Sequence, residues 1–247
     1  MRIFNAGRWF GVFLGLAAAA GAETADDVVA RYVAARGGAE KIHAIRTLDM
    51  TTTTAMMGRD IEGEIYMKRP SKLRIELRVE DKKILRVFDG KIAWSIFPFH
   101  GGGPEPEEMP ADEAKSLAAQ ADIDGPLVDA RAKGNTIELA GTADVEGSPA
   151  YRLKVTLPGG DVTTIYVDKE TGLRVRETSK VRQQGTEVES DRYFSSYKRV
   201  EGVAFPFSVD TRSQGKSVGH VTYREIRINA PVDDRLFEMG AAGKGGR

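Results

Sequence analysis

The sequence predicts a mainly β protein with a few helices, built as a strongly curved antiparallel sheet or unclosed β-barrel with an N-terminal helix and a helical lid. About a dozen short segments alternate apolar and polar residues, as strands with one buried and one wet face do. Turn pairs such as Asp89-Gly90 join most of these segments directly. One long interruption, at about residues 100–128, contains a helical pattern.

Residues 1–22 have the pattern of a secretory signal peptide. Arg2 and Arg8 give a positive start, an apolar run spans 9–20, and Ala20-Gly21-Ala22 is a small-residue cleavage site. The apolar run is shorter than the roughly 20 residues that a membrane-spanning helix needs. We therefore expect export and cleavage, with an uncleaved N-terminal anchor as the alternative.

The composition narrows the classes of fold and partner. The chain has 36 basic and 36 acidic residues, so its charge gives no reason to expect nucleic acid or an anionic membrane surface as a partner. It has no cysteine, so neither disulfides nor thiol chemistry are expected. A buried core must stabilise the fold, and residues 23–239 are long enough to form one domain around it. The glycine-rich residues 240–247 are expected to be a disordered tail.

A helix is expected at residues 25–36. Thr24 can cap it, and Asp26 and Asp27 suit its positive N-terminal end. Two glycines end it, and a second helical turn is expected at 39–45. Together these elements should plug one end of the sheet.

Short strands are expected at residues 47–57 and throughout 60–99. In the second stretch, Leu73, Ile75 and Leu77 alternate with charged residues, which gives one apolar and one wet face. Four methionines lie on these strands: Met50, Met56, Met57 and Met67. Flexible thioethers suit an irregular apolar ligand as well as they suit ordinary core packing, and both interpretations stay open.

The interruption at about 100–128 should contain a helix at 111–121, just after Pro110. Its apolar stripe is thin and consists of Ala114, Leu117, Ala118 and Ala121. A stripe of this kind buries little surface, so the helix is compatible with a mobile lid or with a fixed crossover. From 136 to 228 the chain is predicted to form consecutive hairpins, which favours a meander, and the tail at 231–237 is expected to cap the sheet edge.

No catalytic or metal-binding set is evident. His43, His100 and His220 are isolated from one another and from regularly spaced carboxylates. Phosphate-binding, dinucleotide-binding and nucleophile-elbow motifs are absent from the sequence. We therefore expect no enzyme activity, no cofactor and no metal, although a sheet that brings distant carboxylates together leaves a hydrolase open.

The concave face of the expected sheet is the surface on which function can rest. In a barrel that closes poorly, this face is too large to be filled by its own side chains. Leaving it in water costs about 25 cal/mol per Å² of apolar area. The face therefore needs an apolar ligand or a plug, and the residue pattern does not decide between them.

One block of the chain resembles a known family. It reads GEIYMKRPSKLRIEL and, after a short gap, VFDGKIAWSIFPF. A strand that ends in Lys-Arg-Pro, an Asp-Gly turn and a Trp strand that ends near Pro have the order found in LolA/LolB-like lipoprotein carriers and outer-membrane lipoprotein-sorting proteins. The matching residues are Lys68, Arg69, Pro70, Asp89, Gly90, Trp94 and Pro98. The C-terminal half has no matching motif, which leaves the cargo open.

The resemblance implies a periplasmic carrier, monomeric and without cofactor, that holds the acyl chains of lipoproteins or other lipids in an apolar cavity. It implies delivery toward the outer membrane, between an inner-membrane donor and an outer-membrane acceptor protein. It also implies that Arg69 hydrogen-bonds the lid in the closed form. The expected cavity wall consists of Ile65, Met67, Leu73, Ile75, Leu77, Trp94 and Ile96. A one-residue slip in the strand register would move these side chains to the other face of the sheet.

Two other functions stay open. A module like MucB or RseB, which senses lipids or lipoproteins through a partner protein, would resemble the same half-barrel without transporting anything. A hydrolase of unknown substrate is the third hypothesis, and no spacing in the sequence argues for it.

Overall fold

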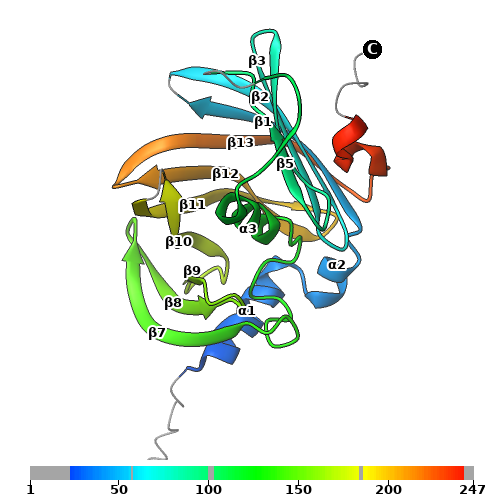
Figure 1. The fold of residues 1–247 in the computed structure, drawn as a ribbon. Coiled ribbons are helices and arrows are strands. Elements are labelled where there is room, and N and C mark those ends of the chain that lie inside the picture. Colours follow the sequence, from blue (N-terminus) through cyan, green and yellow to red (C-terminus); the bar gives the residue numbers. More distant parts are fainter. Residues whose placement is uncertain (1–22, 57, 100–102, 184–185, 242–247) are drawn as a thin grey trace, which may run out of the picture.

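The chain folds into one antiparallel sheet of thirteen strands that curves around the α-helices (Figure 1). The computed structural model describes residues 23–241 except residues 57, 100–102 and 184–185. The strands follow the order β6-β5-β4-β3-β2-β1-β13-β12-β11-β10-β9-β8-β7, so β6 and β7 are the two edges of an open sheet. The predicted fold class, a mainly β and strongly curved antiparallel sheet that does not close, is confirmed.

The strands are β1 (Thr47–Met56), β2 (Arg59–Lys68), β3 (Lys72–Val79), β4 (Lys82–Phe88), β5 (Ala93–Ile96), β6 (Glu107–Glu108), β7 (Thr136–Val145), β8 (Ser148–Thr156), β9 (Val162–Asp168), β10 (Arg174–Gln183), β11 (Thr186–Val200), β12 (Val203–Ser213) and β13 (Lys216–Ile228). All pairs but one join sequence neighbours, as a meander does. The exception is the pairing of β1 with β13, which joins the first half of the sheet to the second.

Helix α1 (Ala25–Arg36) has the predicted bounds. The Thr24 hydroxyl accepts a hydrogen bond from the backbone N–H of Asp27, and the Asp27 carboxylate accepts one from the Thr24 N–H. Gly37 follows with a φ of 123°, and a Cβ atom there would lie 2.4 Å from the Gly202 carbonyl oxygen, so this position requires glycine. The short α2 (Ala39–His43) comes next, and both helices lie at one end of the sheet (Figure 1).

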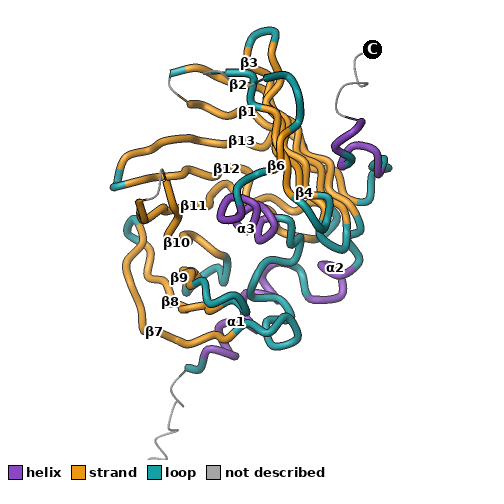
Figure 2. Tube along the Cα trace, in the orientation of Figure 1, coloured by secondary structure: helices purple, strands orange, loops and turns teal. Residues whose placement is uncertain are grey.

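The main core lies between the concave face of the sheet and the helices, which Figure 2 shows inside the curve. Val28 of α1 and Leu117 of α3 (Ala111–Gln120) are fully buried there. They pack in one cluster with side chains from both halves of the sheet, including Leu73 and Leu153. The helices therefore fill space that the open sheet leaves.

A second core lies on the opposite, convex face and is closed by the C-terminal tail. Trp94 is fully buried there in one cluster with Val87, Ile96 and Phe237. The Trp94 indole N–H donates to the Phe237 carbonyl at 3.2 Å. Phe237 ends the short 3₁₀ helix η1 (Asp234–Phe237). The tail therefore covers the outer face of β4 and β5, and the prediction that it caps the sheet edge is wrong.

Polar contacts hold η1 on the convex face. The Lys68 and Lys72 ammonium groups both lie 2.7 Å from the Asp234 carboxylate. The Arg74 guanidinium donates to the Leu236 carbonyl at 2.9 Å. The tail is thus bound to the same strands by charge and by apolar burial.

The prediction that Trp94 and Ile96 share the concave face is wrong. Phe88 pairs with Ala93 across the β4–β5 turn, and Leu73 of the concave face pairs with Phe88. Since side chains alternate along a strand, Ala93 points inward and Trp94 points outward. The length of the turn between β4 and β5 decides which side chains of β5 point inward. One residue more or fewer in this turn would exchange the inward and outward side chains.

Two further segments differ from the sequence prediction, and the two ends of the chain lie outside the described residues. Glu107 and Glu108 form the edge strand β6 in a segment that was expected to hold no strand. Gly240 and Ala241 belong to the 3₁₀ helix η2 (Met239–Ala241) rather than to the predicted disordered tail. The predicted signal peptide and residues 242–247 lie outside the described residues. Of the helices that are described, none has the length and apolar composition needed to cross a membrane.

Replacing Phe237 with alanine should lower the free energy of unfolding by about 3–5 kcal/mol, because the change leaves a cavity under a fully buried Trp94. Urea denaturation followed by tryptophan fluorescence measures this cost. Ile92→Ala is the control, because Ile92 is 41% exposed and its truncation should cost less than about 0.5 kcal/mol. A cost below about 1 kcal/mol for Phe237→Ala would show that the tail does not contribute to the core.

Candidate functional site

The concave face of β1–β5 is largely apolar, and its side chains are buried to different degrees. Cross-strand pairs place its side chains in rows, and the inner row is Leu48, Met67, Leu73, Phe88 and Ala93. The next row toward the strand tips is Met50, Ile65, Ile75, Arg86 and Ser95. Most of the inner row is buried, whereas Ile65, Ile75 and Leu77 are only half-buried. The partly exposed apolar side chains of the face therefore lie on β2–β4, whereas the β1 residues Met50, Thr52 and Thr54 are buried.

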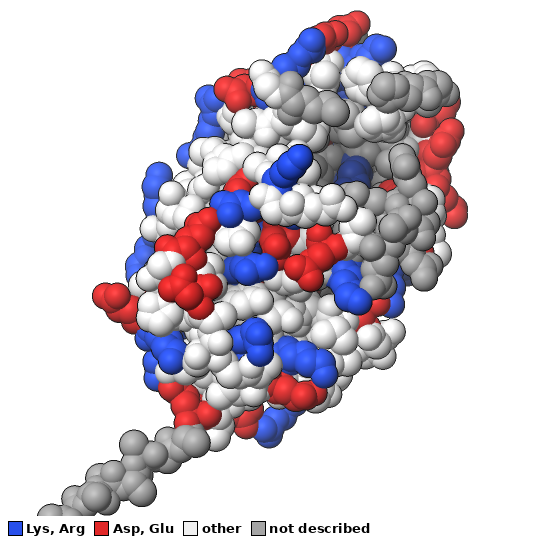
Figure 3. Space-filling model, turned by 90° about the vertical axis from the view of Figure 1, so that its left-hand side faces the viewer, with Lys and Arg blue, Asp and Glu red and all other residues white. Residues whose placement is uncertain are grey.

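A hollow is visible where the strand tips come to the surface. Figure 3 looks at the left-hand side of Figure 1, and the molecule is hollowed in the upper half of this view. Basic atoms lie in the shaded depth of the hollow. A hollow lined by aliphatic side chains suits an apolar chain.

Helix α3 lies across the concave face and contacts β3, β4 and β5. Leu117 is its one fully buried side chain, and Ala121 at its C-terminal end is buried as well. Ala114 and Ala118 are half-buried, and the other residues of the helix are exposed. Within the described part of the chain, no side chain caps its N-terminus, where Pro110 precedes the first turn. The apolar anchors of the helix are therefore Leu117 and Ala121, as the thin stripe predicted, and Lys115 adds an ion pair with Asp161 at 2.6 Å.

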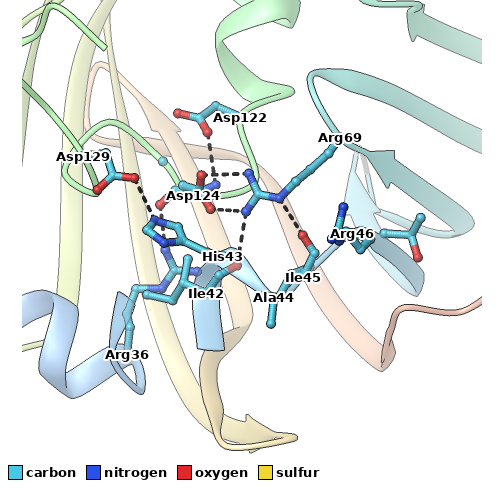
Figure 4. A network of polar contacts seen from close by, with 12 residues as sticks. Arg36, Ile42, His43, Ala44, Ile45, Arg46, Arg69, Asp122, Asp124 and Asp129 are labelled. Carbon is cyan, nitrogen blue, oxygen red and sulfur yellow. Dashed lines mark hydrogen bonds and ion pairs between the residues drawn. The ribbon is translucent and has the colours of Figure 1, made fainter. Parts of the chain in front are cut away.

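Arg69 connects the segment that follows α3 to the rest of the molecule (Figure 4). Its guanidinium donates to both carboxylate oxygens of Asp124, with an Nη1–Oδ2 distance of 2.9 Å. It also donates to the backbone carbonyls of Ile45 at 2.6 Å and Ile42 at 3.1 Å. One side chain at the end of β2 therefore joins α2 to the loop after α3.

Other charged residues surround this contact, and we call the whole group the Arg69 network: Arg36, His43, Arg69, Asp122, Asp124, Asp129 and Lys133. Arg36 donates to the Asp124 carbonyl at 2.8 Å, and Lys133 pairs with Asp122 at 2.6 Å. His43 lies 2.7 Å from Asp129. Three acidic side chains just after α3 thus face four basic ones.

Both partners of the central contact are charged at neutral pH. Burial raises the pKa of the Asp124 carboxyl, but hydrogen bonds from Arg69 and the charges of Arg69 and Lys133 outweigh burial, so this pKa lies below its ordinary value of 3.8. Hydrogen bonding to Asp124 raises the pKa of the Arg69 guanidinium. The Asp124 side chain is 7% exposed, so the pair is shielded from water on the carboxylate side.

Five of the seven predicted wall residues come together on the concave face: Ile65, Met67, Leu73, Ile75 and Leu77. Trp94 and Ile96 do not join them. Sequence reasoning missed Phe88 and Ala93, which take the inward positions of β4 and β5. It also missed Asp124 as the partner of Arg69, although two aspartates directly after the predicted lid helix were a usable signal.

A cleft at the edge of the main core lies beside α1. Its volume is about 890 Å³, and it runs between α1 and the segment that leads into β7. Val29 and Val33 line it from the helix, and Leu127 and Ile137 line it from the other side. It therefore uses the face of α1 that does not pack beneath α3.

One constellation resembles a nucleophilic triad. The Ser208 hydroxyl lies 3.1 Å from His220 Nε2, and His220 Nδ1 lies 3.9 Å from Asp210. The second distance is too long for a hydrogen bond, and the Asp210 carboxylate instead accepts bonds from Arg212 and Ser217. The histidine is therefore not oriented by the carboxylate, as general-base catalysis by a triad requires.

The fold and the site define a class of protein: an open β half-barrel whose apolar concave face is covered by a helix with few apolar anchors. No family model and no curated protein matches the sequence. Solved structures do match, and three of them match over 88% of this chain.

A LolA superfamily protein from Nitrosomonas europaea is 13% identical, is covered over 98% of its length and has a TM-score of 0.56. A domain from Vibrio parahaemolyticus described as an outer membrane lipoprotein-sorting protein is 9% identical, is covered over 97% and has a TM-score of 0.61. A DUF1329 family protein from Desulfovibrio piger is 14% identical, is covered over 98% and has a TM-score of 0.59. The chain therefore shares the fold of these three proteins, in agreement with the resemblance of the block around Arg69.

Removing one partner of the central contact should destabilise the fold. Arg69→Leu leaves the Asp124 carboxylate buried with only more distant cations and should cost about 3 kcal/mol, whereas Asp124→Asn keeps the shape and should cost about 1–2 kcal/mol. The double variant should cost less than the sum of the two. Urea denaturation gives all three values. Arg59→Leu, in an exposed pair with Glu80, is the control and should cost less than about 1 kcal/mol, and additive costs would contradict a direct coupling.

The contribution of Asp124 should disappear in acid. Because its pKa is lower in the folded state than its ordinary 3.8, its ionised form stabilises the fold above that value, and this stabilisation is lost as the pH falls through the folded pKa. The difference in unfolding free energy between wild type and Asp124→Asn should therefore be constant from pH 7 to about 5 and shrink below about 4. Denaturation curves across this range measure it, and a difference that persists at pH 3 would contradict the assignment.

Proposed function

We propose that the protein is a periplasmic carrier that holds the acyl chains of lipoproteins or other lipids beneath α3 and delivers them toward the outer membrane. The observation that carries the proposal is the exposure of three concave-face residues, Ile65, Ile75 and Leu77, which are half-buried although wholly aliphatic. Exposed apolar area of this kind is unfavourable by about 25 cal/mol per Å², so a bound hydrocarbon chain stabilises the molecule.

Helix α3 is the natural entrance in this proposal. Its displacement exposes the inner row of Leu73 and Phe88, and Leu117 is the one large side chain that must leave the core. The Arg69 network holds the end of the helix that stays attached, through Asp124. In this proposal the N-terminal end of α3 swings while the C-terminal end acts as a hinge. The half-barrel fold shared with the LolA superfamily protein supports a carrier, and donor and acceptor proteins in the two membranes belong to the same proposal.

Native mass spectrometry of the protein purified from the periplasm tests this function directly. A carrier should co-purify with lipid or with an acylated peptide, and after delipidation it should take up a triacylated lipopeptide and release it to acceptor vesicles. Binding without release would favour a lipid-sensing module of the MucB or RseB type over transport. If neither a lipid nor a lipopeptide binds, the proposal is wrong.

A large side chain on the concave face should weaken the binding of an acyl chain without unfolding the protein. Ile75→Trp places a large ring in the half-buried row and should lower the affinity for a fluorescent acyl-chain probe at least about tenfold, by displacing the chain from the wall. Arg78→Trp is the matched control, because it lies on the same strand with its side chain 49% exposed. Equal affinity of the Ile75→Trp variant and the wild type would place the ligand elsewhere.

A further inference from the structure

We infer that the concave face selects amphiphiles with an anionic headgroup, a carboxylate or a phosphate, and that Arg86 is the residue that holds this headgroup. The inference rests on the proposed lipid-binding function and specifies the ligand class. It starts from one cation on an otherwise apolar wall.

The register fixes the face on which Arg86 lies. On β4 it pairs with Ile75 of β3 and with Ser95 of β5, and its neighbours on the same face are Ile84 and Phe88. Arg86 and Ser95 are both half-buried. The guanidinium is therefore attached to the wall of the hollow, one row closer to the strand tips than Phe88.

Arg86 differs from every other basic side chain of β2, β3 and β4. Each of those has a polar partner: Arg59 with Glu80, Lys68 and Lys72 with Asp234, Arg74 and Lys83 with Glu76, Arg78 with Glu64, and Lys82 with the Pro98 carbonyl. Arg86 forms no hydrogen bond or ion pair with any residue that the structure describes. A half-buried cation beside aliphatic side chains is unfavourable unless an anion compensates it.

The nearest acidic residue in the same row is Glu107. It pairs with Ser95 on the edge strand β6, one strand beyond the neighbour of Arg86, and its side chain is exposed. It does not pair with Arg86 and instead faces solvent at the rim. Asp112 and Glu113 in the first turn of α3 are exposed as well, and neither forms an ion pair with Arg86.

The arrangement of rows gives the ligand a direction. The inner row of Leu73, Phe88 and Ala93 lies in the core cluster with Leu117 of α3 and offers only hydrocarbon. Arg86 lies one row farther out, about 7 Å along the strand. An amphiphile with its chain on the inner row places its headgroup at this distance, where a guanidinium can donate two parallel hydrogen bonds to a carboxylate or a phosphate.

Matched ligands test the inference. Laurate, dodecyl phosphate and the neutral monolaurin share a twelve-carbon chain, and their affinities can be compared by competition with one fluorescent acyl probe. Wild type should bind at least one of the two anions about tenfold or more tightly than monolaurin. A preference for laurate identifies a carboxylate headgroup, and a preference for dodecyl phosphate identifies a phosphate.

Three variants complete the test. Arg86→Gln should lose the preference for anions while its affinity for monolaurin stays within about twofold of wild type. Arg86→Lys keeps the charge without the planar fork and should retain part of the preference. Lys83→Gln, on the same strand but paired with Glu76, is the control and should bind as wild type does.

The outcomes separate this inference from the proposed function. Equal binding of the anions and monolaurin by wild type, or an anion preference that survives Arg86→Gln, would overturn the role of Arg86 and leave lipid binding intact. If none of the three amphiphiles binds, the proposed function itself fails. The monolaurin affinity of Arg86→Gln also shows that this variant is folded.

Discussion

A sheet of thirteen strands that curves without closing has a concave side that its own side chains do not fill, and the rest of the structure follows from this constraint. Helices have to cover that side. At one end α1 and α2 do so with large, fully buried residues such as Val28 and Ile42. At the other end α3 contributes one such residue, Leu117. The cover over the concave side is therefore thinner at α3 than at α1 and α2.

The convex side makes this arrangement stable. Trp94 and Phe237 bury the outer surface of β4 and β5, and the Arg74–Glu76 pair is buried beside them, with side chains 10% and 6% exposed. The strands that form the wall of the hollow are thus packed from behind. The wall therefore has packing on its convex face as well as beneath α3.

Much of the fold could be predicted from the sequence because it depends on local signals. The alternation of apolar and polar residues predicted the strands. The Thr24 cap and the glycines after Arg36 predicted the bounds of α1. The positions of Lys-Arg-Pro and Asp-Gly, through the family resemblance, predicted the half-barrel. The parity of β5 could not be predicted in this way, because Trp94 is as apolar as a concave-face residue. The β4–β5 turn places it outward, and the later tail with Phe237, some 140 residues away, covers it there. Alternation within one strand carries no information about such a contact.

The residues of the candidate site could be predicted from the sequence to about the same extent as the fold. The aliphatic residues of β2 and β3 were found because they alternate with charges. Arg86 was not singled out, since one arginine among Ile84, Leu85 and Val87 looks like a solvated position until the register shows which face it shares with Ile75. The prediction of a lid helix and of Arg69 at its attachment needed the family resemblance, because no property of a single arginine identifies its partner in advance.

The pattern of charge compensation separates structural charges from functional ones in this molecule. Asp124 is buried with Arg69, Glu76 with Arg74, and Glu177 on the far wall is shared by Arg174 and Arg192. In each case the counter-ion belongs to the chain, as expected of charges that are buried in order to hold a fold together. Arg86 lies on an apolar surface, and the described part of the chain supplies no counter-ion for it. This difference is the reason why we propose that Arg86 meets a charge that arrives with a ligand from outside.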